Sequence, residues 1–437
     1  MVRTPGRKTE AMRAPYHSCK KVFLTPFMDR TRRSGTENFF LILMIGVLNT
    51  ITPFSIDMYL PAFPQIAVDL HTTIGEVALS VSTYFLGFAV GQLLYGPLLD
   101  RYGRKRPLYT GLLLYIVATI GCTMAHSIEM LWVMRFVQAL SGCVASVAAM
   151  AMVRDFFPVH KSAQIISLLV LVLGLSPLLA PSVGSLIIVA WGWRFVFVTL
   201  AAIAFVMLLV SFFFLPEGHR PDKDISLHPV HIVGGFKDIL LERQFYVFVL
   251  AGTFSLSGLF VYVASSPAVF MDHFQLSAKL YGGIFAMLSV GFIGGSQLNH
   301  ILVRRYGNRR IFKTALVCQV ILSALFLFCS LYSWCGLGMV LGFLFSILAC
   351  TGISVPNASA IALAPFSKNA GSASALLGFI QIGIGGLISS GVGLLHLRGS
   401  LTMALIMAVT SGMALVILSA VKVRIEENPV LLNTAMH

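Results

Sequence analysis

The sequence predicts an all-α integral membrane protein with twelve transmembrane helices in two pseudo-symmetric bundles of six. Three observations support this fold class. First, 57% of the 437 residues are hydrophobic and only 11% are charged, whereas soluble proteins carry roughly a quarter charged residues. Second, twelve apolar stretches are long enough to cross a bilayer. Third, a segment of the first half of the chain recurs in the second half.

The chain begins with a polar, basic segment, residues 1–38, which contains nine Lys or Arg and three acids. It lacks the apolar core and cleavage site of a secretory signal peptide ahead of the first span. We therefore expect a basic cytoplasmic tail. An organellar transit peptide is the alternative for this segment.

Each span is assigned where about 20 mostly apolar residues follow one another. The twelve predicted spans are 39–60, 77–99, 107–127, 130–152, 163–189, 194–215, 245–270, 280–303, 312–331, 334–355, 371–395 and 399–421. The longest polar interval, 217–244, follows the sixth span and is expected to be a cytoplasmic linker. It separates an N-terminal bundle, 39–216, from a C-terminal bundle, 245–421, which a tail over 422–437 follows.

The distribution of Lys and Arg predicts the orientation. If the N-terminus is inside, the inner segments hold 27 of the 31 basic residues and the outer segments hold three, Arg194, Lys279 and Arg398. Cytoplasmic loops are enriched in Lys and Arg. Both termini are therefore expected in the cytoplasm. The remaining basic residue, Arg135, lies inside the fourth span.

The internal repeat aligns residues 87–106 with residues 291–310 at an offset of 204, with nine of twenty positions identical and no gap. Each copy ends the second span of its half and enters an inner turn. Parallel repeats about an axis normal to the membrane place a binding site at their interface. We therefore expect a site between the halves.

Asp57 and Arg135 are the acid and the base that the predicted spans leave inside the hydrocarbon layer. A charge there costs on the order of 3 to 15 kcal/mol, so such residues usually face a cavity or a partner. Burial disfavours the ionised form of a carboxylate and a nearby guanidinium favours it. A carboxylate that is wet and Arg-paired in one state and drier in another would exchange protons with conformation. The alternative is that Asp57, between Pro53 and Pro61, caps a helix end.

Gln138 lies on the same helix face as Arg135, three residues later. It either holds a substrate or steadies Arg135. Arg135 itself is expected to line a cavity or to donate structural hydrogen bonds, because its guanidinium does not lose its proton.

The inner turn after the second span carries Asp100, Arg101, Arg104 and Lys105, and Gly103 permits the tight turn. These charges either act as a conformational gate or only set the orientation of the helices. In the second copy Arg304 replaces Asp100 and Asn308 replaces Arg104. Any gate in that copy is therefore expected to be weaker, with only positive charges left.

Small residues and prolines mark two further spans. Gly174, Pro177, Pro181 and Gly184 in the fifth span predict a kinked helix that packs closely on a helix of the other half. The eleventh span is similar in character, with glycines at 378, 383, 385, 386, 391 and 393. A pair of such helices, one per half, would suit rocking of the halves about a fixed site.

Other polar side chains in or next to the spans are candidates for lining the cavity. They are Asn49, Tyr59, Tyr262, Ser266, Asn357 and Gln381. The aromatic residues Phe260 and Phe379 either stack on a substrate or belong to the core.

Several segments together resemble the major facilitator superfamily. "GPLLDRYGRKRP" at 96–107 is similar to its signature G-x-x-x-D-R-x-G-R-[RK]. "RFVQALSG" at 135–142 is similar to R-x-x-Q-G, with Ala139 in place of Gly. "LSPLLAPSVGS" at 175–185 is similar to the antiporter signature G-P-x-x-G-G, although Ala180 and Ser185 replace glycines. "IDMYLPA" at 56–62 narrows the resemblance to the Bcr/CflA group of drug:proton antiporters.

The resemblance implies export of small amphipathic, drug-like compounds across the bacterial inner membrane, driven by protons. It implies that Asp57 and Arg135 take part in proton coupling or substrate binding, and that the charged turn at 100–105 favours the outward-facing state. Related multidrug antiporters can carry a second acid two turns before the first. This chain has Asn49 there, so Asp57 would act without that partner.

The sequence gives no case for an enzyme. Walker A, HExxH and GxSxG patterns are absent, so the driving force is expected to be an ion gradient with no cofactor. The seven cysteines form no CxxC pair, no metal site is expected, and no basic domain suggests nucleic-acid binding. The expected partners are protons, the small-molecule substrate and lipid, and the expected state is a monomer. A metabolite symporter of the same fold and a non-transporting receptor or scaffold are the competing functions.

Overall fold

The computed structural model describes residues 35–157, 159–216, 236–366, 370–395 and 399–421. Residues 1–34 of the predicted tail, residues 217–235 of the predicted linker and the tail after residue 421 lie outside this description. Every described element is helical, as the composition predicts.

Twelve long helices account for the described spans. In the first half they are α1 Gly35–Asp57, α3 Ile74–Tyr102, α4 Lys105–Thr123, α5 Ile128–Phe156, α6 Val159–Trp191 and α7 Arg194–Phe214. In the second half they are α9 Arg243–Pro267, α10 Ala278–Tyr306, α11 Asn308–Leu331, α12 Leu337–Leu363, α13 Ala370–Leu394 and α14 Leu401–Ala420. The short helices η1 Leu60–Ala62 and α2 Phe63–Asp69 follow α1, and η2 Ala268–His273 follows α9.

Ten of these helical segments are long and apolar enough to cross a membrane by length and composition within the described chain. The other two are α4, which starts with the basic pair Lys105–Arg106, and α6, in which the stretch with all side chains described, Leu175–Trp191, is apolar but shorter. Each helix coincides with one predicted span. The twelve-helix prediction is therefore confirmed.

Local sequence explains where several helices begin and end. Thr73, Ser127 and Ser277 cap α3, α5 and α10, because each side-chain oxygen accepts a backbone N–H of the first turn. The two copies of the repeat end α3 and α10 at Gly103 and Gly307, with φ of 82° and 72°. This backbone conformation favours glycine, so the repeat specifies the same helix end in each half.

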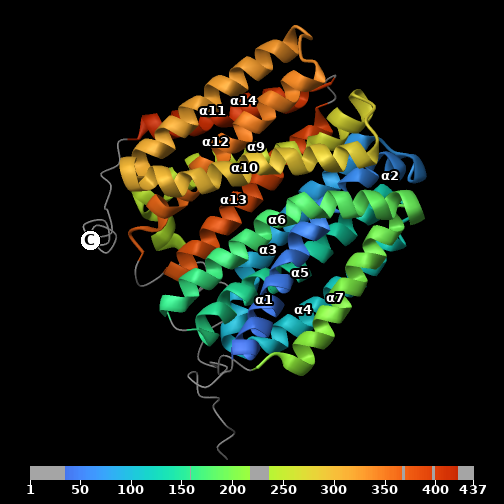
Figure 1. Ribbon diagram of the computed structural model, residues 1–437, viewed down its shortest axis with the longest axis vertical. Coiled ribbons are helices and arrows are strands. Elements are labelled where there is room, and N and C mark those ends of the chain that lie inside the picture. Colours follow the sequence, from blue (N-terminus) through green and yellow to red (C-terminus); the bar gives the residue numbers. More distant parts are fainter. Residues whose placement is uncertain (1–34, 158, 217–235, 367–369, 396–398, 422–437) are drawn as a thin grey trace, which may run out of the picture.

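The helices form two bundles, coloured blue to green and yellow to red in Figure 1. An apolar core from α1, α4, α5 and α7 fills the first bundle, and one from α9, α11, α12 and α13 fills the second. The bundles meet along two seams, α3 against α13 and α6 against α10. A third apolar cluster, which includes Met58 and Phe270, extends across both bundles.

The two ends of the molecule differ, and we name them the α2 end and the Arg104 end after the elements found there. At the α2 end, the Cα of Ser182 on α6 would be 3.2 Å from a Cβ placed on Gly282 of α10. In the other seam, a Cβ on Gly393 of α13 would lie 2.6 Å from the carbonyl oxygen of Gly75 on α3. Both seams therefore bring backbones together at the α2 end. Figure 1 shows α6 and α10 farther apart at their other ends.

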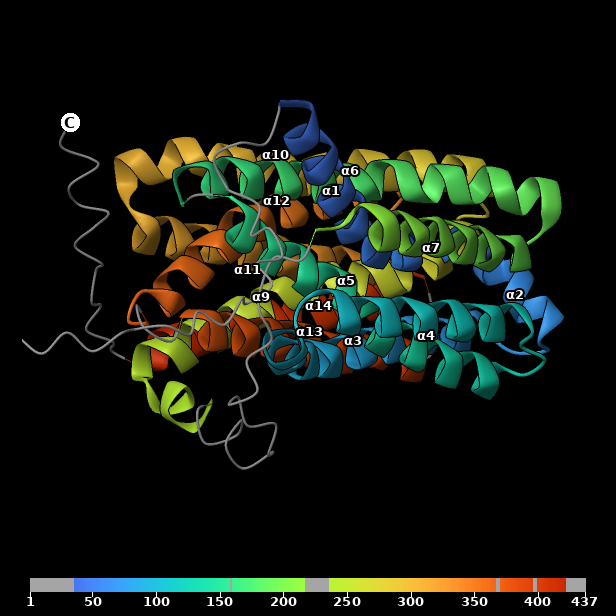
Figure 2. The ribbon, with the colours of Figure 1, turned by 90° about the horizontal axis from the view of Figure 1, so that it is seen from below.

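The small-residue helices α6 and α13 each pack on a helix of the opposite bundle, although they do not pack on each other. Gly184 of α6 faces its own half, because a Cβ there would overlap the carbonyl oxygen of Met58. The close contact of α6 with the other half is made instead at Pro181 and Ser182, next to Gly282. In the side view of Figure 2, α6 and α10 run along the same edge of the molecule.

Several helix ends differ from the predicted boundaries by a few residues, and two of these differences concern polar residues of interest. The first span ends as an α-helix at Asp57, and the chain continues as η1 rather than running on to residue 60. The tenth span was predicted to stop at 355 but continues to Leu363, with Pro356 inside the helix. Asn357 lies just beyond the predicted end and is buried, because its amide donates to Asn299 on α10 at 2.6 Å. The side-chain nitrogen of Asn357 is thus bonded inside the bundle, while its side-chain oxygen has no partner among the described residues.

Candidate functional site

A cavity of about 370 Å³ lies between the bundles. Its walls come from α1, α3 and α6 of the first bundle and from α9, α10 and α12 of the second. The lining is mostly apolar: Pro53, Ile56, Phe85, Leu175, Pro177, Leu178, Leu259, Phe260, Val263, Phe285, Phe292, Ile293 and Leu348. The polar lining residues are Asp57, Tyr262, Ser289, Ser296 and Gln297. The predicted interface between the repeats therefore contains a cavity.

Asp57 contributes the carboxylate of this cavity and is only 5% exposed. It is the last residue of α1, after Pro53 inside the helix and before Pro61. The helix dipole disfavours a negative charge at a C-terminal end. No hydrogen bond or ion pair joins the carboxylate to another residue in the described part of the chain. The capping alternative is not seen either, since η1 and α2 have no side-chain cap.

Tyr262 of α9 is the second polar side chain of interest on the cavity wall. It is 1% exposed, and its hydroxyl has no hydrogen-bond partner among the described residues. Its ring stacks on Phe285 of α10, with centroids 5.2 Å apart. A buried hydroxyl without a partner is costly. Tyr262 therefore offers a hydrogen bond to a bound molecule.

Arg135 is fully buried within the first bundle, away from the cavity wall. Its guanidinium carbon lies 4.3 Å from the ring centroids of both Tyr59 and Tyr84, so the cation is held between two aromatic faces. Nη1 donates to Oε1 of Gln138 at 2.6 Å, and Nε2 of Gln138 donates to Thr119 at 2.8 Å. Gln138 thus steadies Arg135. Nε and Nη2 of Arg135 have no hydrogen-bond partner in the described chain.

The expected pair of Asp57 and Arg135 is not formed. Their depths are compatible, but Asp57 faces the cavity while Arg135 contacts Tyr59, Tyr84 and Phe197 inside the first bundle. Sequence position fixes the depth of a residue along a helix but not its neighbours in the bundle. The structure therefore shows a state in which the carboxylate is buried and is not paired with Arg135.

Most of the other candidate lining residues lie off the cavity wall. Tyr59 bonds to Ser80 and Ser266 bonds to Tyr281, at 2.7 and 2.8 Å between oxygens. Asn357 donates to Asn299, Gln381 donates to Ser359 at 3.5 Å, and Asn49 is buried with its amide nitrogen unpartnered among the described residues. Of the set, only Tyr262 lines the cavity. A polar residue in the middle of a span can either form a hydrogen bond with another buried side chain or face a cavity. The sequence alone does not distinguish these two cases.

The two aromatic candidates separate. Phe260 lines the cavity and packs edge-on against Phe85 across the seam, with centroids 4.6 Å apart. Phe379 packs against the core of the second bundle. Phe260 is therefore the aromatic residue placed to touch a bound molecule.

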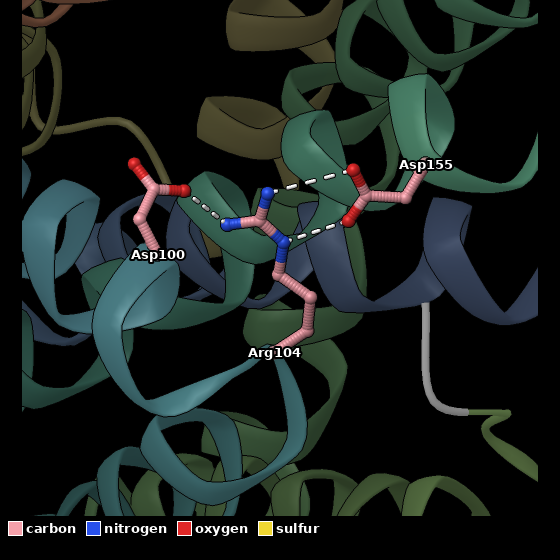
Figure 3. Close-up of polar contacts among 3 residues, drawn as sticks. All are labelled: Asp100, Arg104 and Asp155. Atoms are coloured by element: carbon pink, nitrogen blue, oxygen red, sulfur yellow. Dashed lines mark hydrogen bonds and ion pairs between the residues drawn. The ribbon is translucent and has the colours of Figure 1, made fainter. Parts of the chain in front are cut away.

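The charged turn at the Arg104 end forms a compact network, shown in Figure 3. Nη1 of Arg104 donates to Asp100 at 2.7 Å, and Nε donates to Asp155 at 2.7 Å. Nη2 lies 3.5 Å from the second oxygen of Asp155. Burial lowers the pKa of Arg104, but the bonds to Asp155 and Asp100 outweigh it and hold the pKa above its usual value. The network joins the α3–α4 turn to the end of α5, within one bundle.

The other two basic residues predicted for this turn are Arg101 and Lys105. Arg101 lies over the ring of Tyr102, with its guanidinium carbon 5.8 Å from the centroid. Lys105 begins α4 and is half-buried. Asp155 is the residue of this network that sequence reasoning missed. Its signal was an acid next to a base, Arg154, at the end of the fourth span.

The second copy of the turn has no such network among its described side chains. Arg305 and Arg310 both lie near the ring of Tyr306, at 5.4 and 5.9 Å from its centroid. The side chain of Arg304 lies outside the description. No group of three or more potential metal ligands occurs among the described residues either.

Comparison with known proteins adds sequence and fold relatives. Residues 45–390 match the family model described as Major Facilitator Superfamily. A bicyclomycin resistance protein homolog of Haemophilus influenzae is 29% identical over 354 residues, which cover 81% of this chain and 89% of the relative. The multidrug resistance protein MdtL of Klebsiella pneumoniae is 30% identical over 348 residues, covering 78% and 85%.

Solved structures agree in fold. The crystal structure of a D-xylose-proton symporter matches with a TM-score of 0.71 at 15% identity, over 88% of this chain and 98% of that one. A bacterial homolog of the human lysosomal transporter Spinster, in an inward-facing and occupied conformation, matches with a TM-score of 0.64 at 14% identity, over 89% and 96%. At such identities the likeness speaks for the fold alone.

Proposed function

The chain belongs to the major facilitator superfamily, and on that premise we propose that it exports small amphipathic compounds from a bacterial cell in exchange for protons. The named relatives, a bicyclomycin resistance protein homolog and a multidrug resistance protein, support drug-like substrates. Transport proceeds by alternating access of the cavity to the two sides of the inner membrane. The Arg104 end faces the cytoplasm, because the basic turns gather there.

One observation carries the proposal: a buried carboxylate without a partner in the described chain lies on the wall of an apolar cavity between the two bundles. In such a cavity an ionised carboxylate is costly and either a proton or a cationic group relieves the cost. Proton and substrate therefore compete for Asp57. When the cavity opens to the cytoplasm, the carboxylate of Asp57 loses its proton and binds substrate. When it opens to the outside, a proton binds Asp57 and the substrate leaves.

Tyr262 and Phe260 supply the substrate contacts in this mechanism. The free hydroxyl of Tyr262 gives one hydrogen bond, and the ring of Phe260 gives an apolar face. The remaining apolar wall accepts compounds of varied shape, because contact with it has little directional demand. Arg135 acts at a distance as a fixed positive charge in the first bundle.

The proposal is tested by Asp57→Asn in membrane vesicles and in a drug-sensitive bacterial host challenged with a panel of antibiotics that includes bicyclomycin. We expect loss of uphill export by at least tenfold, with the protein folded and inserted as before. The matched control is Asp69→Asn, which neutralises an acid at the α2 end that bonds to Trp193 and Arg194 instead of facing the cavity. Undiminished proton-driven export by Asp57→Asn would overturn the assignment.

The same assay separates the competing functions. For an exporter, an uncoupler that collapses the proton gradient raises drug accumulation in cells with the wild-type chain. For a symporter that imports a metabolite, the uncoupler would instead lower the accumulation of the transported compound. A receptor or scaffold would show no substrate-dependent proton flux with any compound of the panel.

A further inference from the structure

A second cavity, of about 260 Å³, lies at the Arg104 end of the second bundle, outside the site described above. We call it the α9–α11–α14 groove after the helices that form it. Arg309 and Lys313 of α11 supply its charge, and Ser419 of α14 adds a hydroxyl. Its apolar lining residues are Val247, Phe248, Leu415, Leu418 and Val421.

The charges of this groove are not neutralised within the described chain. Arg309 and Lys313 are both exposed, and neither forms an ion pair with any described carboxylate. They stand four residues apart, so both project from one face of α11. In the first bundle, Arg104 of the matching turn bonds to two carboxylates, whereas its counterpart in the second copy is the uncharged Asn308. The second bundle thus carries positive charge at this groove that has no counter-ion from the described protein.

The position of the groove indicates what supplies the counter-ion. Val247 is near the start of α9, Lys313 near the start of α11 and Ser419 near the end of α14. Each therefore lies within about two helical turns, roughly 11 Å, of a helix end. This is the level at which lipid head groups meet acyl chains. The apolar walls suit a lipid acyl chain below that level. The charged ends of the Arg309 and Lys313 side chains can extend toward a lipid phosphate.

We propose that the α9–α11–α14 groove binds the phosphodiester head group and first acyl carbons of an anionic phospholipid. Arg309 and Lys313 hold the phosphate, and Phe248 and Leu418 contact the chain. Basic pockets between transmembrane helices on the inner side are suited to such lipids. The lipid gives the second bundle the counter-charge that Asp100 and Asp155 give the first.

The test titrates the purified full-length chain in detergent with short-chain phosphatidylglycerol and measures occupancy by native mass spectrometry. Phosphatidylcholine of the same chain length and glycerol 3-phosphate are titrated in parallel. We expect phosphatidylglycerol to bind at least tenfold more tightly than either. Equal binding of phosphatidylcholine would overturn the anionic-lipid assignment, and equal binding of glycerol 3-phosphate would make the groove a free-phosphate site and overturn the lipid assignment.

Substitutions of basic residues test whether the lipid binds at this groove. Arg309→Gln with Lys313→Gln is expected to weaken phosphatidylglycerol binding by about 30-fold, from the attraction of two basic residues to an anionic surface. The control, Arg305→Gln with Arg310→Gln, removes the same charge beside Tyr306 and is expected to change binding less than threefold. Exchanging the groove residues, Arg309→Lys with Lys313→Arg, retains charge and should retain binding. Equal losses in the two Gln pairs would show that net charge alone attracts lipid and would refute the groove.

Discussion

Replacing Asp155 by Ala tests whether the Arg104 network depends on the acid that the sequence signature does not include. Arg104 has 9% of its side chain exposed, and Asp155 has 14%. The 2.7 Å bond from Nε is a charge-assisted bond in a mostly dry setting, which contributes about 1.5 to 3 kcal/mol. The 3.5 Å contact of Nη2 adds little. Removing Asp155 also leaves buried donors of Arg104 without an acceptor, so we expect a loss of about 3 kcal/mol in the free energy of unfolding.

Asp100→Ala is the matched control, and it should cost much less. Asp100 has 48% of its side chain exposed and contributes one bond to Arg104 four residues later. Exposed pairs at this spacing are screened by water and contribute about 0.5 kcal/mol. The structure thus ranks Asp155 well above Asp100, although only Asp100 belongs to the sequence signature.

The assay is the free energy of unfolding of the purified chain, measured by titration with a denaturing detergent. The two alanine variants are measured alone and in an Arg104→Met background. We expect a coupling energy of about 2 kcal/mol between Arg104 and Asp155 in this double-mutant cycle. The reasoning would be refuted if Asp100→Ala cost as much as Asp155→Ala, or if Asp155→Ala cost the same with and without Arg104.

Two further predictions concern packing in the first bundle. Gly184→Ala should lower the free energy of unfolding by about 1 to 3 kcal/mol, because the added methyl group overlaps the carbonyl oxygen of Met58. Gly294→Ala, with no atom within 4 Å of the added carbon, should be neutral or stabilising in the same measurement. Arg135→Lys should lower it by about 2 kcal/mol, since an ammonium cannot stack between two rings as a guanidinium does. Wild-type stability of the lysine variant would argue against the stacked cation.

Much of the fold could be predicted from the sequence, because crossing a bilayer imposes a length and a composition on each helix. The repeat also placed two equivalent helix ends correctly, since a glycine with positive φ closes each copy. The tenth span shows the limit of this reasoning. It was predicted to stop at 355 but continues to Leu363, and its polar residues Ser354 and Asn357 bond to Ser255 and Asn299 within the bundle. Hydropathy does not report such pairing.

The candidate site was predictable in part. Asp57 stood out as a lone acid in an apolar segment, and the structure places it on the cavity wall. The surroundings of Arg135 could not be read from the sequence, because Tyr59 and Tyr84 come from two other segments and meet only through tertiary packing. Asp155 was missed for the same reason, since its partner Arg104 lies 51 residues away.

The contact of Gly282 with α6 makes the rest of α10 a lever arm. From Gly282 to Tyr306 the helix extends about 36 Å at roughly 1.5 Å per residue. Each degree by which the second bundle pivots about this contact moves the distant tip of α10 by about 0.6 Å, from the same rise per residue. A pivot of a few degrees therefore moves the Tyr306 end of α10 by about the width of a water molecule, while the contact at Gly282 hardly changes.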